Sequence, residues 1–231
     1  MTLLAIGLSL FVGFVWLFFY LREDIHPEPR GLLLAVFASG IAFAFFAVAL
    51  QVTIRPILAN LQPNAPMNHG LPITLLSLTI LACIEEVMKF AAAHVIVHKN
   101  REFNEPVDAM IYMVVAALGF ATLENFGALS GNSGEPLLLG TVLETASLRF
   151  VGATLLHTLS SGIVGYYWAV SIREFFQARF LFIGIALATL LHVIFNYLIL
   201  NYGNAFYPIL LVTIAGFFVL SDFERLRRKT I

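Results

Sequence analysis

Long apolar stretches separated by short polar connections dominate this sequence. The stretches cover residues 2–21, 31–54, 71–97, 107–129, 141–170, 179–200 and 205–221. A helix of about 20 apolar residues is long enough to cross a bilayer, so each stretch is a candidate transmembrane helix. The pattern predicts an all-α protein, a polytopic membrane bundle of about seven transmembrane helices. Residues 1–231 are expected to form a single domain, because no repeat, low-complexity tract or soluble region interrupts the pattern.

Composition supports this class and excludes others. Of the 231 residues, 60% are hydrophobic and only 12% are charged, whereas a soluble domain has roughly twice that share of charged residues. The chain is therefore expected in the cell membrane as a multi-pass protein surrounded by lipid. Its net charge of −1 gives no reason to expect a nucleic-acid partner. Cys83 is the only cysteine, which excludes an internal disulfide and a metal site built from cysteines.

The basic residues are distributed unevenly between alternate connections. One set of connections, with the C-terminal tail, contains ten: Arg22, Arg30, Lys99, Arg101, Arg173, Arg179, Arg225, Arg227, Arg228 and Lys229. The N-terminus and the other connections contain only Arg55. Since Lys and Arg are enriched on the cytoplasmic side, the N-terminus is expected outside and the C-terminus in the cytoplasm. The acidic residues of the 22–30 connection are expected to be solvated loop charges.

Three ionisable residues lie in the middle of the 71–97 stretch, at Glu85, Glu86 and Lys89. Each charge costs about 3 kcal/mol at the centre of a bilayer, and intramembrane charges of this kind usually mark function. Lys89 follows the two glutamates by four and three positions, so it can pair with either in a purely structural ion pair. Glu85 and Glu86 point about 100° apart on a helix, so only one is expected to face a shared site squarely.

The 107–129 stretch has polar residues near both ends. Asp108 and Tyr112 lie near its start, where an acidic side chain is favourable at a helix N-terminus. Glu124 and Asn125 lie toward its other end, and Glu124 has no cation nearby in the sequence. Arg149, in the next stretch, is the expected partner of Glu124.

Two histidines lie within later apolar stretches. His157 is eight positions after Arg149, and His192 is followed four positions later by Asn196, which places each pair on one side of a helix. In a chain with so few polar residues, these histidines, Asn196 and the glutamate pair are expected to meet in one site.

Two mechanisms of hydrolysis suit such a site. Glu85 or Glu86 can take a proton from water and pass it to a leaving amine, with His157 and His192 orienting the water or the carbonyl and Asn196 donating to an oxyanion. Alternatively, His157, His192 and Glu85 can bind Zn²⁺ and leave one position open for water. The His-Glu-x-x-His pattern of many zinc proteases is missing from the sequence. Spacing alone leaves both zinc and a metal-free site open.

Six motifs in order resemble the PrsW-type intramembrane proteases and, more distantly, the CAAX prenyl proteases and their bacterial CPBP relatives. The motifs are Pro27-Glu28-Pro29, Glu85-Glu86-x-x-Lys89, Asn104-Glu105-Pro106-x-Asp108-x-x-x-Tyr112, Gly119-Phe120-x-x-x-Glu124-Asn125, Arg149 with His157, and His192-x-x-x-Asn196. The resemblance implies an intramembrane endopeptidase acting on membrane-embedded or membrane-proximal proteins or peptides, such as an anti-sigma-factor-like regulator. It implies catalytic roles for Glu85, Glu86, His157, His192 and Asn196. We favour glutamate over metal as the activating group.

Two other classes of function stay open at this point. A catalytically silent scaffold or immunity-type binder could keep the same fold, although a structural bundle would not require the full polar set. A proton or ion transporter could use the charged residues as a relay, but the sequence has no inverted repeat. The oligomeric state is not predicted. The polar residues lie at mid-span or in the outer halves of the stretches, so cleavage is expected at mid-depth or nearer the outside.

Overall fold

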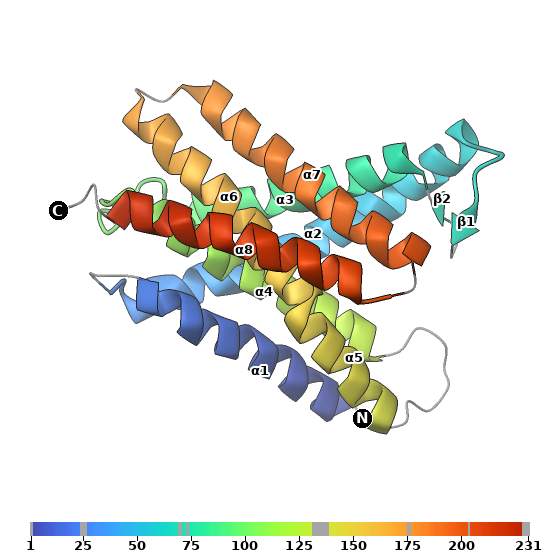
Figure 1. Cartoon of the computed structure of the whole chain (residues 1–231). Coiled ribbons are helices and arrows are strands. Elements are labelled where there is room, and N and C mark those ends of the chain that lie inside the picture. Colours follow the sequence, from blue (N-terminus) through green and yellow to red (C-terminus); the bar gives the residue numbers. More distant parts are fainter. Residues whose placement is uncertain are drawn as a thin grey trace.

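The computed structural model of the chain describes residues 2–23, 27–68, 71–72, 74–130, 139–174, 177–202 and 204–227. Its elements are α1 (Thr2–Tyr20), the short 3-10 helix η1 (Leu21–Glu23), α2 (Arg30–Leu61), β1 (Met67–Asn68), β2 (Leu71–Pro72), α3 (Leu75–Val97), α4 (Asp108–Ser130), α5 (Leu139–Val151), α6 (Ala153–Arg173), α7 (Ala178–Tyr202) and α8 (Phe206–Arg227). The strands pair as one small antiparallel hairpin, and the rest of the described regular structure is helical (Figure 1).

The helices confirm a polytopic membrane bundle. Five of them, α1, α2, α4, α7 and α8, are long and apolar enough to cross a membrane. The remaining two predicted stretches correspond to α3, which has three charged residues at its centre, and to α5 and α6 together. The predicted connection at 130–140 and the basic residues Arg228 and Lys229 fall largely outside the described residues.

Two predicted boundaries are wrong. Helix α2 does not end at residue 54 but continues through Pro56 to Leu61. Proline removes one intrahelical hydrogen bond, yet Pro56 is exposed near the helix end, where the helix tolerates the loss. The stretch 141–170 is not one helix either, because Gly152 has φ −103° and ψ −87° and separates α5 from α6. Glycine is the residue at which the backbone most easily leaves the helical conformation.

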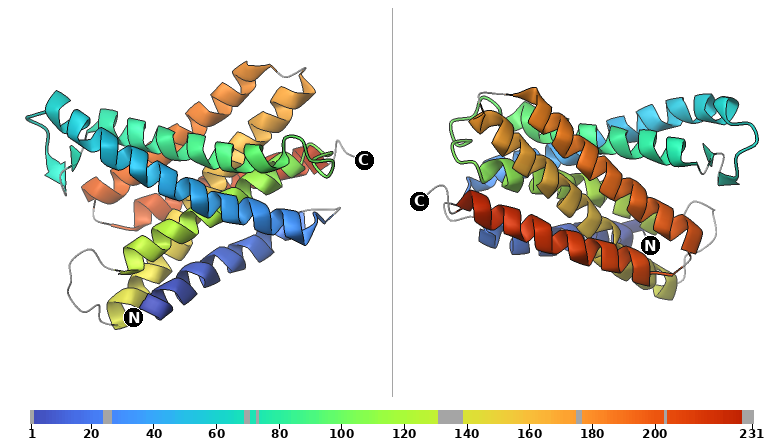
Figure 2. Two further views of the ribbon diagram at one scale, coloured as in Figure 1. Left: turned by 180° about the vertical axis from the view of Figure 1, so that it is seen from behind. Right: turned by 45° about the horizontal axis from the view of Figure 1, so that its top comes forward.

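Helix α4 forms the centre of the bundle. Of the residues in its 18-residue apolar segment, 83% are buried, compared with 28% of those in the corresponding segments of α1 and α8. Its sequence is apolar on all sides over most of its length, which is typical of a helix surrounded by other helices. Helices α1, α2 and α6 pack against it, and α7 packs against α3 and α6 (Figures 1 and 2).

Helices α2 and α4 cross in direct backbone contact. A Cβ atom at Gly40 would lie 2.1 Å from the carbonyl oxygen of Ala116, and one at Gly119 would lie 2.0 Å from that of Phe37. Small residues permit such close approach between membrane helices. This crossing fixes α2, which contacts α3 along its length, relative to the central helix.

Substitution of Gly119 by Ala is therefore expected to destabilise the bundle. The added methyl group meets rigid backbone, and overpacking of this kind costs about 1–3 kcal/mol or more. Thermal unfolding in detergent should show a lower Tm. Gly127→Ala in the same helix is the matched control, since a Cβ atom added there would meet no atom within 4 Å. An equal Tm for Gly119→Ala and the unsubstituted protein would contradict the close crossing.

The connections rich in basic residues gather at one end of the bundle. The C-terminal end of α8 lies there, as do the junctions of α1 with α2, α3 with α4, and α6 with α7 (Figure 1). The N-terminus, the β-hairpin and the junction of α7 with α8 lie at the other end (Figure 1). The fold thus separates the two predicted classes of connection, and which end is cytoplasmic stays a prediction.

Candidate active site

A buried ion pair lies at the centre of α3. Lys89 Nζ is 2.7 Å from Glu86 Oε1, and both side chains are fully buried. Lys89 Nζ also donates to Ser160 Oγ at 3.1 Å and lies 3.3 Å from His157 Nδ1 on α6. The prediction that Lys89 pairs with one of the two glutamates is confirmed for Glu86. These contacts offset part of the cost of placing two charges inside the bundle.

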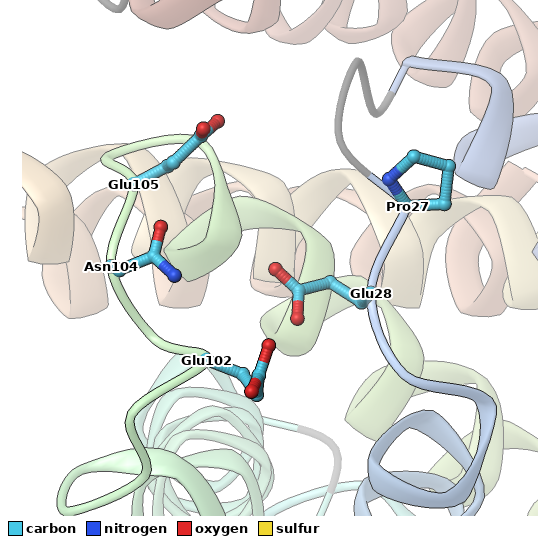
Figure 3. A pocket seen from close by; sticks show the side chains of 5 residues that line it. All are labelled: Pro27, Glu28, Glu102, Asn104 and Glu105. Atoms are coloured by element: carbon cyan, nitrogen blue, oxygen red, sulfur yellow. The ribbon is translucent and has the colours of Figure 1, made fainter.

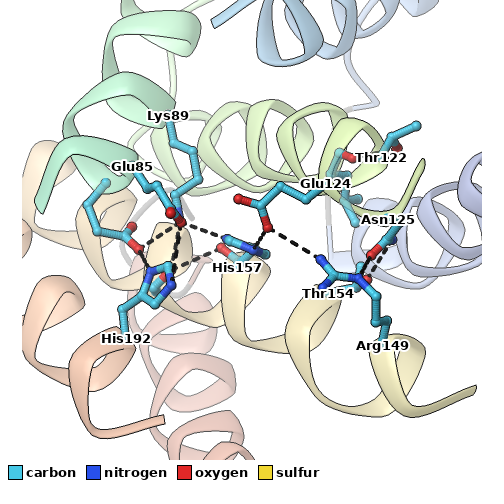
Figure 4. Close-up of polar contacts among 12 residues, drawn as sticks. Glu85, Lys89, Thr122, Glu124, Asn125, Arg149, Thr154, His157 and His192 are labelled. Carbon is cyan, nitrogen blue, oxygen red and sulfur yellow. Dashed lines mark hydrogen bonds and ion pairs between the residues drawn. The ribbon is translucent and has the colours of Figure 1, made fainter. Parts of the chain in front are cut away.

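His192 of α7 lies between the two glutamates. Its Nδ1 is 2.7 Å from Glu86 Oε1, and its Nε2 is 3.4 Å from Glu85 Oε2 (Figure 4). The expectation that only one glutamate faces the site is wrong, because the imidazole has a nitrogen on each side and reaches both carboxylates. Glu85 retains a 14% exposed side chain, whereas Glu86 has none.

A second carboxylate–imidazole pair joins α4 to α6. His157 Nε2 is 2.8 Å from Glu124 Oε2, and the same oxygen is 3.4 Å from Arg149 Nη2 (Figure 4). Arg149 Nε donates to Asn125 Oδ1, and Asn125 Nδ2 donates to Thr154 Oγ1 at 3.0 Å. The predicted pairing of Arg149 with Glu124 is confirmed. Glu124 has a second partner as well, because the same carboxylate contacts His157.

The two imidazoles meet edge to face, with ring centroids 5.3 Å apart. The predicted convergence of the histidines and the glutamate pair is therefore confirmed as geometry. Asn196 lies one turn beyond His192 on α7, and its side chain makes no hydrogen bond to another described residue. Its role as a donor to an oxyanion stays a prediction.

Asp108 and Tyr112 lie in a different cluster, near the start of α4. The Asp108 carboxylate reaches back to accept the backbone N–H groups of Asn104 at 2.9 Å and Glu105 at 2.7 Å, as an acidic side chain in the first turn of a helix can do. Tyr112 Oη donates to the Glu28 carboxylate. Glu28 is only 9% exposed, so the expectation of a solvated loop charge is wrong for this residue.

This second cluster borders a cavity of about 330 Å³ between the 27–29 turn and the 102–105 loop. Pro27, Glu28, Glu102, Asn104 and Glu105 line it (Figure 3). Its contacts hold the turn before α2 against α4 and lie apart from the carboxylate–imidazole pairs.

Gln51 is a site residue that the sequence analysis missed. Its Nε2 donates to Glu85 Oε1 at 2.8 Å from α2. The sequence could have indicated this residue, because Gln51 is the only amide side chain in the apolar stretch 31–54. Ser160, which accepts a hydrogen bond from Lys89, is a second such residue.

Glu85, His157 and His192 fit the requirements of a metal site. Each offers one ligand atom, and these atoms lie within 4.8 Å of one another. Two histidines and one glutamate are a known ligand set for catalytic zinc.

The surroundings of the two histidines also suit zinc. Glu86 contacts one ring nitrogen of His192 and Glu124 contacts one of His157, so each imidazole has a carboxylate partner and a second nitrogen. Such outer carboxylates orient histidine ligands in zinc sites. Lys89 Nζ lies beside the second nitrogen of His157, so an ion bound there would lie close to an ammonium group.

Comparison with known proteins identifies the family. Residues 28–221 match the model of the PrsW family intramembrane metalloprotease. The chain belongs to the PrsW family. It is 28% identical to Protease PrsW of Geobacillus kaustophilus over 190 residues, which cover 79% of this chain and 73% of the relative. It is 25% identical to Protease PrsW of Bacillus subtilis over 195 residues, or 84% of this chain and 81% of the relative. No solved structure matches.

Membership of the PrsW family, together with the apolar helices, makes the chain a multi-pass intramembrane protease of the cell membrane. The resemblance noted in the sequence is thereby confirmed. An enzyme is favoured over the scaffold and the transporter that the sequence left open. The roles of individual residues in the PrsW site stay predictions.

Proposed function

We propose that the chain hydrolyses peptide bonds of membrane-embedded or membrane-proximal proteins at the cluster of Glu85, Glu86, His157 and His192. The observation that carries this proposal is the convergence of two carboxylate–imidazole pairs beside Glu85, largely buried among the helices, in a protein of a protease family. Groups held in this way are pre-oriented for proton transfer and for charge stabilisation.

Glu85 is the carboxylate best placed to activate water. It is the more exposed of the two glutamates on α3, and Gln51 holds its Oε1. Its Oε2, 3.4 Å from His192 Nε2, is the oxygen that we assign to the reacting water. Glu86 is committed to Lys89 and His192, so we assign it the role of fixing these two side chains.

In the proposed reaction, Glu85 takes a proton from water while the water oxygen bonds to the scissile carbonyl carbon. His192, which lies beside Glu85, orients the water, and the side-chain amide of Asn196 donates to the oxygen that becomes negative in this step. His157, held by Glu124 and Lys89, packs against His192 and fixes its ring. The carbon–nitrogen bond then breaks, and Glu85 returns the proton to the leaving nitrogen. The products are a new carboxylate and a new amine.

Zinc, when bound by Glu85, His157 and His192, supplies Lewis acidity that makes water more nucleophilic and polarises a carbonyl. We expect zinc to raise the Tm of metal-stripped protein, because a ligand that binds only the folded state stabilises it by about 2.7 kcal/mol at 100 times its Kd. A His157→Ala/His192→Ala variant should show no such rise. An absent rise in the unsubstituted protein would contradict this metal site and leave Glu85 as a metal-free base.

The substrate is expected to be a single-span membrane protein or peptide, such as an anti-sigma-factor-like regulator. We further propose that the end of the bundle with the basic connections is cytoplasmic. The cut would then occur at mid-depth or nearer the outside. Cleavage products protected only on the cytoplasmic side would contradict this placement.

The function is tested by mapping newly formed N-termini in membranes of bacteria that produce the protein. Mass spectrometry should find new N-termini within or beside the membrane spans of resident proteins, and these should be absent from cells that produce Glu85→Gln at the same level. The same set of N-termini in both cultures would contradict the proposal.

A further inference from the structure

A cavity of about 580 Å³ lies beside the carboxylate–imidazole pairs, where α5, α6, α7 and α8 meet. Its lining is mostly apolar: Ser147, Leu148, Arg149, Val151, Gly152, Ala153, Phe195, Ile199, Asn204, Ala205, Pro208 and Ile209. We call it the α5–α8 cavity. Its lining includes Asn204 and Ala205 at the junction of α7 with α8, and this junction lies at the end of the bundle that holds the N-terminus (Figure 1).

Two residues connect the α5–α8 cavity to the site. Arg149 lines the cavity and also contacts Glu124, whose same oxygen contacts His157 (Figure 4). Phe195 lines the cavity three positions after His192 on α7, which places both on one side of that helix. The cavity is therefore bordered by one residue linked to His157 through Glu124 and by one neighbour of His192 on α7.

The cavity is accessible from the surrounding lipid. Leu148, Ile199 and Ile209 on its rim are 53%, 48% and 36% exposed. Its volume falls within the range of roughly 300–1,000 Å³ that is typical of ligand sites, and its apolar lining with few polar groups is typical as well.

The polar groups of the cavity suit an unwound peptide. A protease must open the helix of its substrate, which leaves backbone carbonyl groups without partners in an apolar medium. Arg149 has five N–H donors, of which the described contacts to Asn125 and Glu124 use two. Asn204 Oδ1 accepts the N–H of Phe206, which leaves its side-chain amide as a donor. A lipid tail would use neither donor.

We propose that the α5–α8 cavity binds the unwound apolar segment of the substrate beside the scissile bond and selects a large apolar side chain there. Arg149 donates to a backbone carbonyl of this segment. The proposal rests on the proposed function and adds to it the route of entry, between α5 and α8 toward the end of the bundle that holds the N-terminus.

The test measures peptide cleavage by purified variants reconstituted in liposomes, one of which has a narrowed cavity. Ile199→Trp places a bulky ring on the rim, and Leu200→Trp is the matched control, since Leu200 is 42% exposed but does not line the cavity. The probes are synthetic single-span peptides in which Phe or Ala occupies each position in turn around the cleaved bond. Ile199→Trp should lower kcat/KM for the best Phe peptide by about 10-fold, chiefly through KM, and affect Ala peptides less. Leu200→Trp should change neither.

Equal preference for Phe over Ala in Ile199→Trp and Leu200→Trp would overturn the proposal and leave the proposed function intact. Failure of the unsubstituted protein to cut any peptide would overturn both. A binding measurement that needs no cleavage completes the test. In the Glu85→Gln background, a photoreactive benzoylphenylalanine at position 148 should cross-link the peptide, and one at position 143, on α5 but outside the cavity, should not. Cross-links from position 148 only to lipid or to a second copy would overturn the proposal.

Discussion

Replacement of Glu85 by Gln is expected to lower the rate of peptide cleavage by about 10²–10⁴-fold, the usual contribution of a general acid–base group. The amide has nearly the same shape as the carboxylate but cannot take a proton from water, and it is a poor zinc ligand. The loss is thus expected with or without metal. The Lys89–Glu86 pair is left in place, so the Tm should change little.

The matched control for this change is Glu144→Gln. Glu144 is exposed on α5, outside the carboxylate–imidazole pairs. The Glu144→Gln substitution removes one negative charge from the surface and should leave both the rate of cleavage and the Tm unchanged. A fall in Tm of Glu85→Gln that accounts for its lost activity would instead make Glu85 a structural residue.

Replacement of Lys89 by Met is expected to destabilise the folded bundle by about 3–5 kcal/mol, the usual cost of removing one partner from a buried ion pair. Lys89 has no exposed surface and contacts Glu86, His157 and Ser160 at once. Met fills much of the same volume but leaves the Glu86 carboxylate with His192 alone. Unfolding in mixed micelles should show the change, and Lys99→Met, at an exposed position just after α3, should not.

A second substitution shows whether the effect comes from the ion pair. In Glu86→Gln/Lys89→Met neither buried charge remains, so the double variant should lose less stability than the two single variants together. The spacing in the sequence allowed Lys89 to pair with either Glu85 or Glu86, and in the structure Lys89 forms its ion pair with Glu86. Strict additivity of the two single effects would contradict the coupling between Glu86 and Lys89.

Much of the fold could be predicted from the sequence, because the membrane requires long apolar helices and leaves few alternatives. Polar residues are costly there, so the few within the apolar stretches indicated the candidate site, whose residues Glu85, Glu86, His157 and His192 lie together in the structure. The break at Gly152 was not predictable from hydropathy, since the residues on both sides of it are equally compatible with one continuous helix.

Partners across helices were harder to predict than the residues themselves. Helical spacing gives the direction of a side chain on its own helix, but not which other helix it meets. Thus the link from Glu124 to His157 depends on how α4 packs against α6, and the contact of Gln51 with Glu85 depends on how α2 packs against α3. The burial of Glu28 likewise depends on Tyr112, which is 84 positions away in the chain.

The central claim is that the cluster around Glu85 hydrolyses peptide bonds, and labelled water tests it most directly. Purified protein in liposomes would cut a single-span peptide in water enriched in heavy oxygen, and mass spectrometry would weigh the products. We predict one heavy oxygen atom in the new C-terminal carboxylate of products from the unsubstituted protein, and product formation about 10²–10⁴-fold slower by Glu85→Gln of equal Tm. Labelled product formed equally fast by Glu85→Gln would contradict the claim.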